Sequence, residues 1–228
     1  MRFGTRLAGW WRGWWPTLAV VLTVLTFRSA VADWYDVPTG SMQPTIYEGE
    51  RIFCNKLAYG IKVPFSDWEL ARWDDPARGE IIVLDSPHDG TRLVKRIVAE
   101  AGDVVAMRGG VLLINGEPAT YEPGAPPAWP LPPEFAGEHL YLTETVADMS
   151  HEVMMSLEQP IARDFGPVTV PAGHVFVSGD NRDHSFDSRF FGFVPVENVT
   201  GHVTAILASV DRDRHWRPRW GRFLTALH

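Results

Sequence analysis

The sequence is poor in residues on which several common enzyme chemistries depend. Its 228 residues include one cysteine, Cys54, so no disulfide can form within the chain and no cysteine cluster can bind a metal. The eight histidines show neither an HExxH pattern nor an i,i+4 pair, and no phosphate-binding glycine loop or GxSxG elbow is present. These absences argue against metal, nucleotide and α/β-hydrolase chemistry, and no cofactor is expected.

Positive charge is also scarce. The net charge is −7, and no basic run with interleaved aromatic residues occurs in the body of the chain, so no nucleic-acid partner is expected. Hydrophobic residues make up 45% of the sequence and aromatic residues 12%, which is enough to form a core in one domain or in a domain with a large insertion.

Residues 13–34 form the longest apolar stretch, centred on residues 17–27. As a helix rising about 1.5 Å per residue, this stretch would cross a hydrocarbon core of about 30 Å. We therefore expect a single transmembrane anchor, with residues 1–12 in the cytoplasm and the following domain on the outer side of the membrane. The cytoplasmic assignment depends on three basic residues that precede the apolar run, Arg2, Arg6 and Arg12.

A cleaved signal peptide is the alternative interpretation of this segment. Ala30-Val31-Ala32 before Asp33 has the A-x-A form of a cleavage site, so cleavage or self-cleavage there would release a soluble domain. Arg28 interrupts the apolar run close to that site and favours the anchor. Either interpretation exports the rest of the chain.

The chain after residue 36 predicts a mainly β fold, because short apolar runs alternate with Gly, Pro and Asp. We expect a catalytic core over residues 36–103 and 171–210. We expect residues 104–170 to be an inserted β-rich region that extends the core sheet, and residues 211–228 to be a basic and aromatic tail. Residues 68–75 read as a polar-aromatic connection, and Asn115-Gly116 as a type I′ hairpin turn. Strands are predicted at residues 51–55, 79–85, 91–98, 111–114, 139–146, 151–158, 168–171 and 174–177.

Two polar residues have surroundings that suit catalysis. Ser41 lies in a turn, because Gly40 tolerates unusual backbone conformations and Pro44 fixes φ. Lys95 lies on a predicted strand, where alternation places it on one face with Leu93 and Ile97. Burial among apolar neighbours would lower the lysine pKa from about 10.4 toward about 8, so that the amine can act as a base.

Residues 179–189 form a polar loop with one apolar side chain, Phe186. Considered alone, this composition predicts a solvated turn. The tail at residues 211–228 likewise predicts a solvated end or a segment that adheres to a membrane surface.

Together these segments resemble the bacterial type I signal peptidases. Residues 38–46 resemble the serine box of that family, residues 95–103 its lysine box, and residues 179–189 with 191–195 its last box, while residues 78–83 resemble the strand box between them. The resemblance implies a signal-peptidase and LexA-like β core. It also implies a membrane-bound endopeptidase that removes signal peptides from exported preproteins and cuts after small residues, with a lipid bilayer and the preproteins as partners.

The resemblance also implies roles for individual residues. Ser41 matches the nucleophile and Lys95 the general base, and the Ser41 N–H and the Thr39 hydroxyl match the oxyanion donors. Many members carry serine where this chain has Thr39. Five further residues match supporting positions: Ser185, which would orient the lysine, Asp187 with Arg189, and Asp180 with Arg96.

Two alternative functions stay open at this point. The first is a dedicated peptidase of the same family that matures one pilin or one conjugation protein. The second is a non-catalytic, membrane-tethered domain that binds exported chains.

Overall fold

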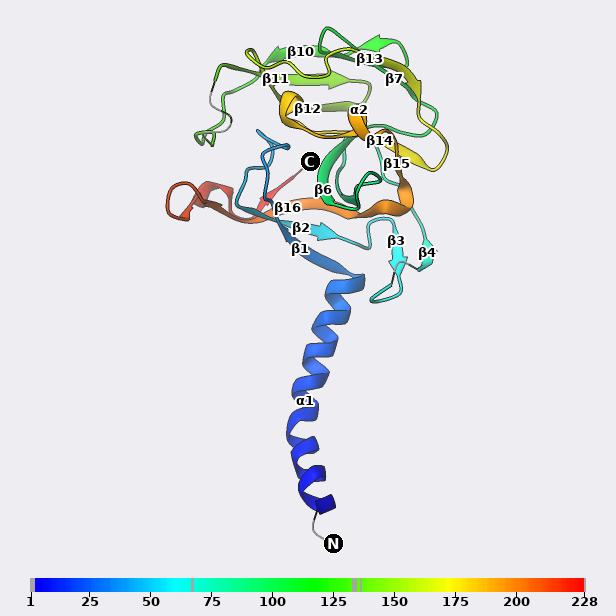
Figure 1. Cartoon of the computed structure of the whole chain (residues 1–228), viewed down its shortest axis with the longest axis vertical. Coiled ribbons are helices and arrows are strands. Elements are labelled where there is room, and N and C mark those ends of the chain that lie inside the picture. The colour runs from blue at the N-terminus through cyan, green and yellow to red at the C-terminus, as the bar shows by residue number, and fades with distance from the viewer. Residues whose placement is uncertain (1–2, 67, 133–134, 136, 228) are drawn as a thin grey trace.

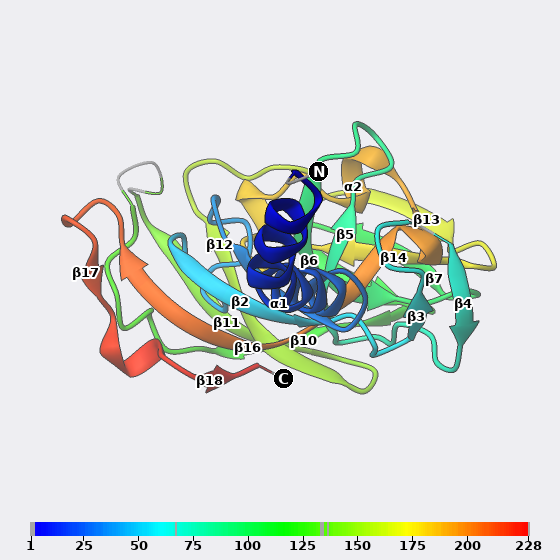
Figure 2. The ribbon, with the colours of Figure 1, turned by 90° about the horizontal axis from the view of Figure 1, so that it is seen from below.

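A long helix and a body of β-strands make up the molecule, whose computed structural model describes residues 3–66, 68–132, 135 and 137–227 (Figure 1). Helix α1 (Phe3–Ala30) projects from the body, and the remaining helical elements are short. The predicted mainly β fold is confirmed. Viewed along α1, the body extends to both sides of the helix, with β17 and β18 on one side and β3 and β4 on the other (Figure 2).

The largest sheet has nine strands, and we call it the main sheet. Its central path runs in the order β1-β2-β16-β5-β6-β14-β15, and β17 and β18 both pair with β16. The strand bounds are β1 Ala32–Asp36, β2 Glu50–Asn55, β5 Ile81–Asp85, β6 Arg92–Ala99, β14 His174–Ser178, β15 Val194–Pro195, β16 Val199–Asp211, β17 Arg217–Pro218 and β18 Thr225–Ala226.

The main sheet is covered on both faces, as the central strand β5 shows. Its apolar residues do not alternate with polar ones, which is the pattern of a strand buried on both sides. Ile81 and Val83 pack into one hydrophobic cluster, and Ile82 and Leu84 pack into another. Strand β6 pairs with β5 and follows the predicted alternation, since Leu93 and Ile97 lie in the second cluster with Ile82.

The inserted region does not extend the main sheet, and that expectation was wrong. Because β14 occupies the edge beside β6, the strands of residues 104–170 pair with one another and form two separate sheets. These sheets lie on the far side of the body from α1 (Figure 1). One contains β10 (Thr120–Pro123), β11 (His139–Val146) and β12 (Met149–Ser156), and the other contains β7 (Val104–Arg108), β8 (Val111–Ile114), β9 (Glu117–Pro118) and β13 (Phe165–Thr169).

Two predicted hairpins of the inserted region are confirmed. Strands β11 and β12 pair antiparallel over their whole length. Asn115 and Gly116 have φ values of 55° and 84° and connect β8 to β9, as a type I′ turn requires.

Two segments that were predicted to lack regular secondary structure contain strands. Residues 68–75 contain a strand, β4 (Glu69–Arg72), which pairs with β3 (Gly60–Lys62). The tail after residue 211 is not simply a solvated end, because β18 pairs with β16 and Arg222 forms an ion pair with the buried Glu50. Both corrections concern partners outside the segment itself, which the composition of the segment does not specify.

Helix α1 contains residues 13–30 of the anchor predicted at residues 13–34, whereas residues 32–34 belong to β1. Within the part of the chain that the structure describes, no helix combines the length and the apolarity needed to cross a membrane. The span predicted for residues 13–34 is therefore unconfirmed.

The A-x-A segment, at which cleavage of a signal peptide was considered, joins α1 to β1 and is not an extended strand throughout. Ala30 ends the helix, Ala32 begins β1, and both are buried. The Val31 carbonyl accepts a hydrogen bond from the Lys56 N–H at 3.0 Å. Cleavage at this site would require the segment to leave these contacts.

Candidate active site

Ser41 begins a series of turns between β1 and β2. The turn is closed by hydrogen bonds from the Gln43 N–H to the Gly40 carbonyl at 3.1 Å and from the Ile46 N–H to the Met42 carbonyl at 2.8 Å. Gly40 is required here for space, because a Cβ atom would lie 2.4 Å from the ring of Phe135. Met42 and Ile46 are buried in the core, so the turn holds Ser41 on a fixed base.

Lys95 reaches this turn from the middle of β6. Its Nζ lies 2.6 Å from the Ser41 Oγ, although 54 residues separate the two in sequence. The lysine is 2% exposed and pairs across the strands with Ile82. Burial lowers the pKa of Lys95 from 10.5 to about 8, although the nearby carboxylates of Asp187 and Asp180 oppose the shift.

These two side chains have the geometry of a nucleophile and its base. A neutral lysine amine can accept the hydroxyl proton at 2.6 Å, which leaves Oγ free to attack an electrophilic carbonyl. Ser41 is partly exposed, so a substrate can reach Oγ while the lysine stays buried. The arrangement thus supports acyl transfer without a histidine.

The predicted supporting pairs lie immediately around the lysine. Arg96 binds Asp180 through two hydrogen bonds of 3.0 and 2.9 Å, and Arg189 binds Asp187 through two of 2.8 Å. Burial opposes ionisation of both carboxylates, but the adjacent guanidinium groups outweigh it and lower the pKa of Asp180 and of Asp187. Both ion pairs are therefore charged and nearly inaccessible to solvent.

Ser185 lacks the contact with Lys95 that was expected of it, while the oxyanion role of Thr39 stays a prediction. The Ser185 hydroxyl lies against Gly179 and contributes to lowering the pKa of Asp187, but it forms no hydrogen bond with Lys95 among the residues described. Thr39 is exposed, and its hydroxyl bonds to no other residue in the described ranges. Thr39 therefore lies two residues before Ser41 and Ser185 lies in the polar loop, and neither hydroxyl has a hydrogen-bond partner among the described residues.

The polar loop at residues 179–189 is largely buried, so the prediction of a solvated turn was wrong. Asn181 binds the turn of Ser41 directly: its N–H donates to the Ser41 carbonyl and its side-chain amide donates to the Gly40 carbonyl, each at 3.1 Å. Thr45 also contacts the loop, with its hydroxyl 2.6 Å from Asp180. The close spacing of both charge signs in this loop was the available signal, since buried charges need partners.

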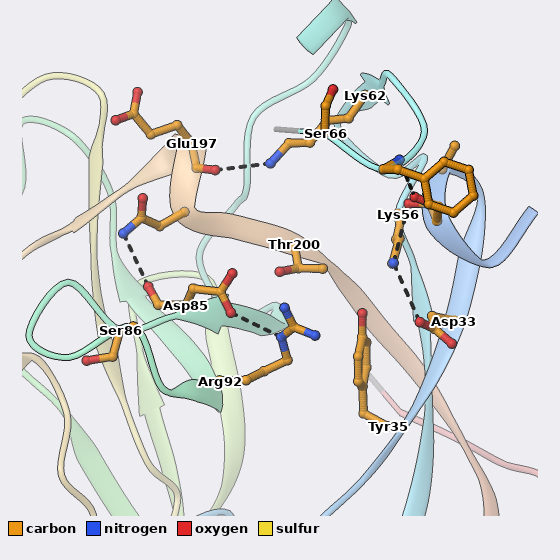
Figure 3. A pocket seen from close by; sticks show the side chains of 15 residues that line it. Asp33, Tyr35, Lys56, Lys62, Ser66, Asp85, Ser86, Arg92, Glu197 and Thr200 are labelled. Atoms are coloured by element: carbon orange, nitrogen blue, oxygen red, sulfur yellow. Dashed lines mark hydrogen bonds and ion pairs between the residues drawn. The ribbon is translucent and has the colours of Figure 1, made fainter. Parts of the chain in front are cut away.

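A cavity of about 720 Å³ lies elsewhere in the molecule, at the end of α1 (Figure 3). Oppositely charged side chains line it, including Lys56 near Asp33 and Arg92 hydrogen-bonded to Asp85. Neither Ser41 nor Lys95 contributes to this cavity.

Comparison with known proteins gives consistent results. Residues 10–208 match the model of the family described as signal peptidase, peptidase S26. The chain is 35% identical to a signal peptidase I of Pseudomonas fluorescens over 83% of this chain and 69% of that protein. It is 31% identical to a signal peptidase I of Haemophilus influenzae over 93% of this chain and 73% of that protein.

A solved structure is also similar in sequence. The crystal structure of a signal peptidase I from Enterococcus faecalis is 30% identical and covers 57% of this chain and 98% of its own. The TM-score between the two structures is 0.36.

Proposed function

This chain belongs to the signal peptidase family, peptidase S26, as a serine endopeptidase that removes signal peptides from exported preproteins, and we propose that Ser41 and Lys95 form its catalytic dyad. The contact of 2.6 Å between the Ser41 hydroxyl and a buried lysine is the observation that supports this assignment. No metal or organic cofactor is needed for the dyad to supply the nucleophile, the base and the acid.

The reaction begins with proton transfer. Neutral Lys95 takes the Ser41 proton as Oγ attacks the scissile carbonyl, and a tetrahedral oxyanion forms. The resulting ammonium then gives its proton to the leaving amine, and the peptide bond breaks to leave an ester on Ser41. A water molecule, deprotonated by the again neutral lysine, hydrolyses this ester and restores the hydroxyl.

The oxyanion needs hydrogen-bond donors beside Ser41. The Ser41 N–H bonds to no other described residue and is available for this role. The Thr39 hydroxyl is the proposed second donor, since it is exposed two residues earlier and would rotate toward the substrate carbonyl. Asp180 with Arg96, Asp187 with Arg189, and Ser185 are proposed to hold the lysine and its surroundings.

Substrate selection gives the direct test of the activity. We expect the wild-type protein to cut a preprotein after a small residue, with a second small residue two positions earlier, and replacement of the residue before the cut with tryptophan to prevent cleavage. An extended substrate would add main-chain hydrogen bonds as a further strand. Mass spectrometry of the released protein identifies the cut, and cleavage at unrelated positions would contradict the proposal. A panel of unrelated preproteins separates a general peptidase from one dedicated to a pilin or a conjugation protein.

We further propose that α1 attaches the enzyme to a bilayer, with its N-terminus in the cytoplasm and the β body on the outer side. The helix projects from the body (Figure 1), and nine large apolar residues between residues 14 and 27 are exposed. Arg28 is compensated at the end of the helix by an ion pair with Asp33 and by stacking on Trp34. The large apolar residues of α1 that the structure shows exposed by 46% or more are Trp14, Trp15, Leu18, Val20, Val21, Leu22, Val24, Leu25 and Phe27.

Attachment is tested by flotation of the full chain with phospholipid vesicles. Wild type is expected to float with the vesicles after an alkaline wash, because each buried leucine side chain contributes about 2 kcal/mol. A variant with aspartate at Leu18, Leu22 and Leu25 should stay in solution, whereas the matched variant with valine at these positions should float. Wild-type protein that remains in solution would contradict the attachment and leave the proposed dyad untouched.

A further inference from the structure

A buried group of ionisable side chains joins the inserted region to the polar loop at residues 179–189. Glu144 on β11 and His151 on β12 face each other across the hairpin. The Arg182 guanidinium donates one hydrogen bond to each carboxylate oxygen of Glu144, both at 2.7 Å, and the Tyr121 hydroxyl donates a third at 2.6 Å. Glu144 is fully buried and Arg182 is 3% exposed, so this bidentate ion pair is shielded from solvent and salt.

His151 lies between this ion pair and the one beside Lys95. Its Nε2 is 3.4 Å from Arg182 Nη2, 3.6 Å from Asp180 Oδ1 and 3.7 Å from Glu144 Oε1. The imidazole therefore separates the two carboxylates and accepts a hydrogen bond from Arg182. Asp180 continues the connection, because it binds Arg96, the residue after Lys95 in β6.

The same segment of loop holds the turn of Ser41. Asn181 lies between Asp180 and Arg182, and it donates hydrogen bonds to the carbonyls of Ser41 and Gly40. The hairpin also binds the loop through its backbone, since the Met154 N–H donates to the Asp180 carbonyl at 2.8 Å. A shift of Glu144 would thus be transmitted through Arg182 and Asn181 to the nucleophile.

We propose that Glu144 and His151 are positioning residues for the peptidase reaction, which hold the segment from Asp180 to Arg182 where it fixes the Ser41 turn. Through these two residues the inserted region then contributes to positioning the nucleophile. This inference depends on the proposed Ser41 and Lys95 dyad and deepens it.

The charges explain why a histidine suits the central position. The two guanidiniums, Arg96 and Arg182, balance the two carboxylates, Asp180 and Glu144, only while His151 is neutral. Burial is the main cause that lowers the pKa of His151 to about 4, with the two arginines acting in the same direction and the two carboxylates opposing. The imidazole is therefore neutral at neutral pH, and the group carries no net charge.

Glu144→Gln tests the inference with little change in volume. The substitution leaves Arg182 buried without its counter-charge, so we expect the segment to move and kcat to fall by about tenfold to a hundredfold, as small displacements at a reacting centre do. KM should change by less than about twofold, because the buried Glu144 cannot contact the substrate. Activity is measured on full-length protein at a temperature where near-ultraviolet circular dichroism shows the variant folded.

Arg108→Gln provides the matched control within the inserted region. Arg108 ties β7 to the Phe165 and Gly166 carbonyls and does not contact the polar loop, so its loss should lower Tm and leave kcat unchanged. Equal kcat for wild type and folded Glu144→Gln would overturn the inference. If Glu144→Gln keeps full activity while Ser41→Ala has none, only the positioning role fails; if Ser41→Ala stays active, the proposed dyad fails.

His151→Gln gives an independent readout through the pH dependence of stability. The pKa of His151 is 6.5 in the unfolded chain and about 4 in the fold, so the unfolded chain binds more protons between these two values. The free energy of unfolding is therefore at its full value above pH 6.5 and falls as the pH decreases toward 4. Tm of the variant should therefore decrease less than that of wild type between pH 7 and 4.5, and kcat at pH 8 should fall by about tenfold or more. Identical pH slopes, or an unchanged kcat, would contradict the central position of His151.

Discussion

Ser41→Ala is expected to abolish preprotein cleavage, with kcat falling by about 10⁴-fold or more, as when the serine of a peptidase is removed. The substitution removes the only hydroxyl within hydrogen-bond distance of Lys95 in the described structure, so no atom remains to form the ester. The fold should be kept, because Ser41 lies in a turn that backbone hydrogen bonds and the buried Met42 and Ile46 maintain. Cleavage is followed by gel and mass spectrometry with purified enzyme in detergent or lipid.

The control makes the same substitution at a serine on the surface. Ser150→Ala on β12 removes an exposed hydroxyl whose one hydrogen-bond partner among the described residues is Thr145, and it should leave kcat unchanged. If Ser41→Ala cleaved as fast as wild type, the contact with Lys95 would have no catalytic meaning. Cleavage by neither protein would instead favour the alternative of a non-catalytic domain that binds exported chains.

The strands, the turn at Ser41 and the apolar neighbours of Lys95 were predictable because their signals are local. Alternation over residues 91–98 places Lys95 between apolar neighbours, and the structure shows that environment with Leu93 and Ile97 in one cluster. Glycine and proline beside Ser41 predict a turn, and a turn is present. In each case the residues that decide the structure lie within a few positions of one another.

The surroundings of the dyad were less predictable because their partners are distant in sequence. Composition alone predicts that residues 179–189 form a solvated loop. In the structure, however, Arg182 binds Glu144, which is 38 residues away in sequence, and Asn181 binds Gly40, which is 141 residues away. The pairing of β13 with β7 likewise joins segments that lie more than 50 residues apart in sequence. A local pattern shows that charged residues gather, but only the fold shows that they are buried together.

The burial that lowers the pKa of Lys95 also destabilises the fold. With its pKa lowered from 10.5 to about 8, the lysine costs about 3 kcal/mol of folding free energy at neutral pH, at about 1.36 kcal/mol per unit. The sign follows from the protons bound: between pH 8 and 10.5 the unfolded chain keeps the lysine proton that the fold has lost, so stability rises with pH through that window. The full cost is present below pH 8 and is relieved above 10.5.

Lys95→Met is therefore expected to change activity and stability in opposite directions. Methionine keeps the length and apolar stem of the side chain but offers no base, so kcat should fall by about 10⁴-fold. The free energy of unfolding at pH 7 should rise by up to about 3 kcal/mol, since a buried charge is removed, less whatever the electrostatic attraction to Asp187 and the hydrogen bond with Ser41 contribute. Denaturant unfolding of the full chain in detergent at pH 7 measures this difference.

The pH profile of the wild type distinguishes a lysine that acts as the base from a lysine that only supplies a positive charge. Because only the neutral amine accepts the Ser41 proton, kcat/KM should rise with pH, about tenfold per unit, up to a midpoint near the lysine pKa of about 8, and then level off. Lys95→Arg retains the positive charge but cannot become neutral in this range, so it should be inactive at every pH tested. A lysine whose role is only to pair with Asp187 would be replaceable by arginine, and activity in Lys95→Arg would exclude Lys95 as the base.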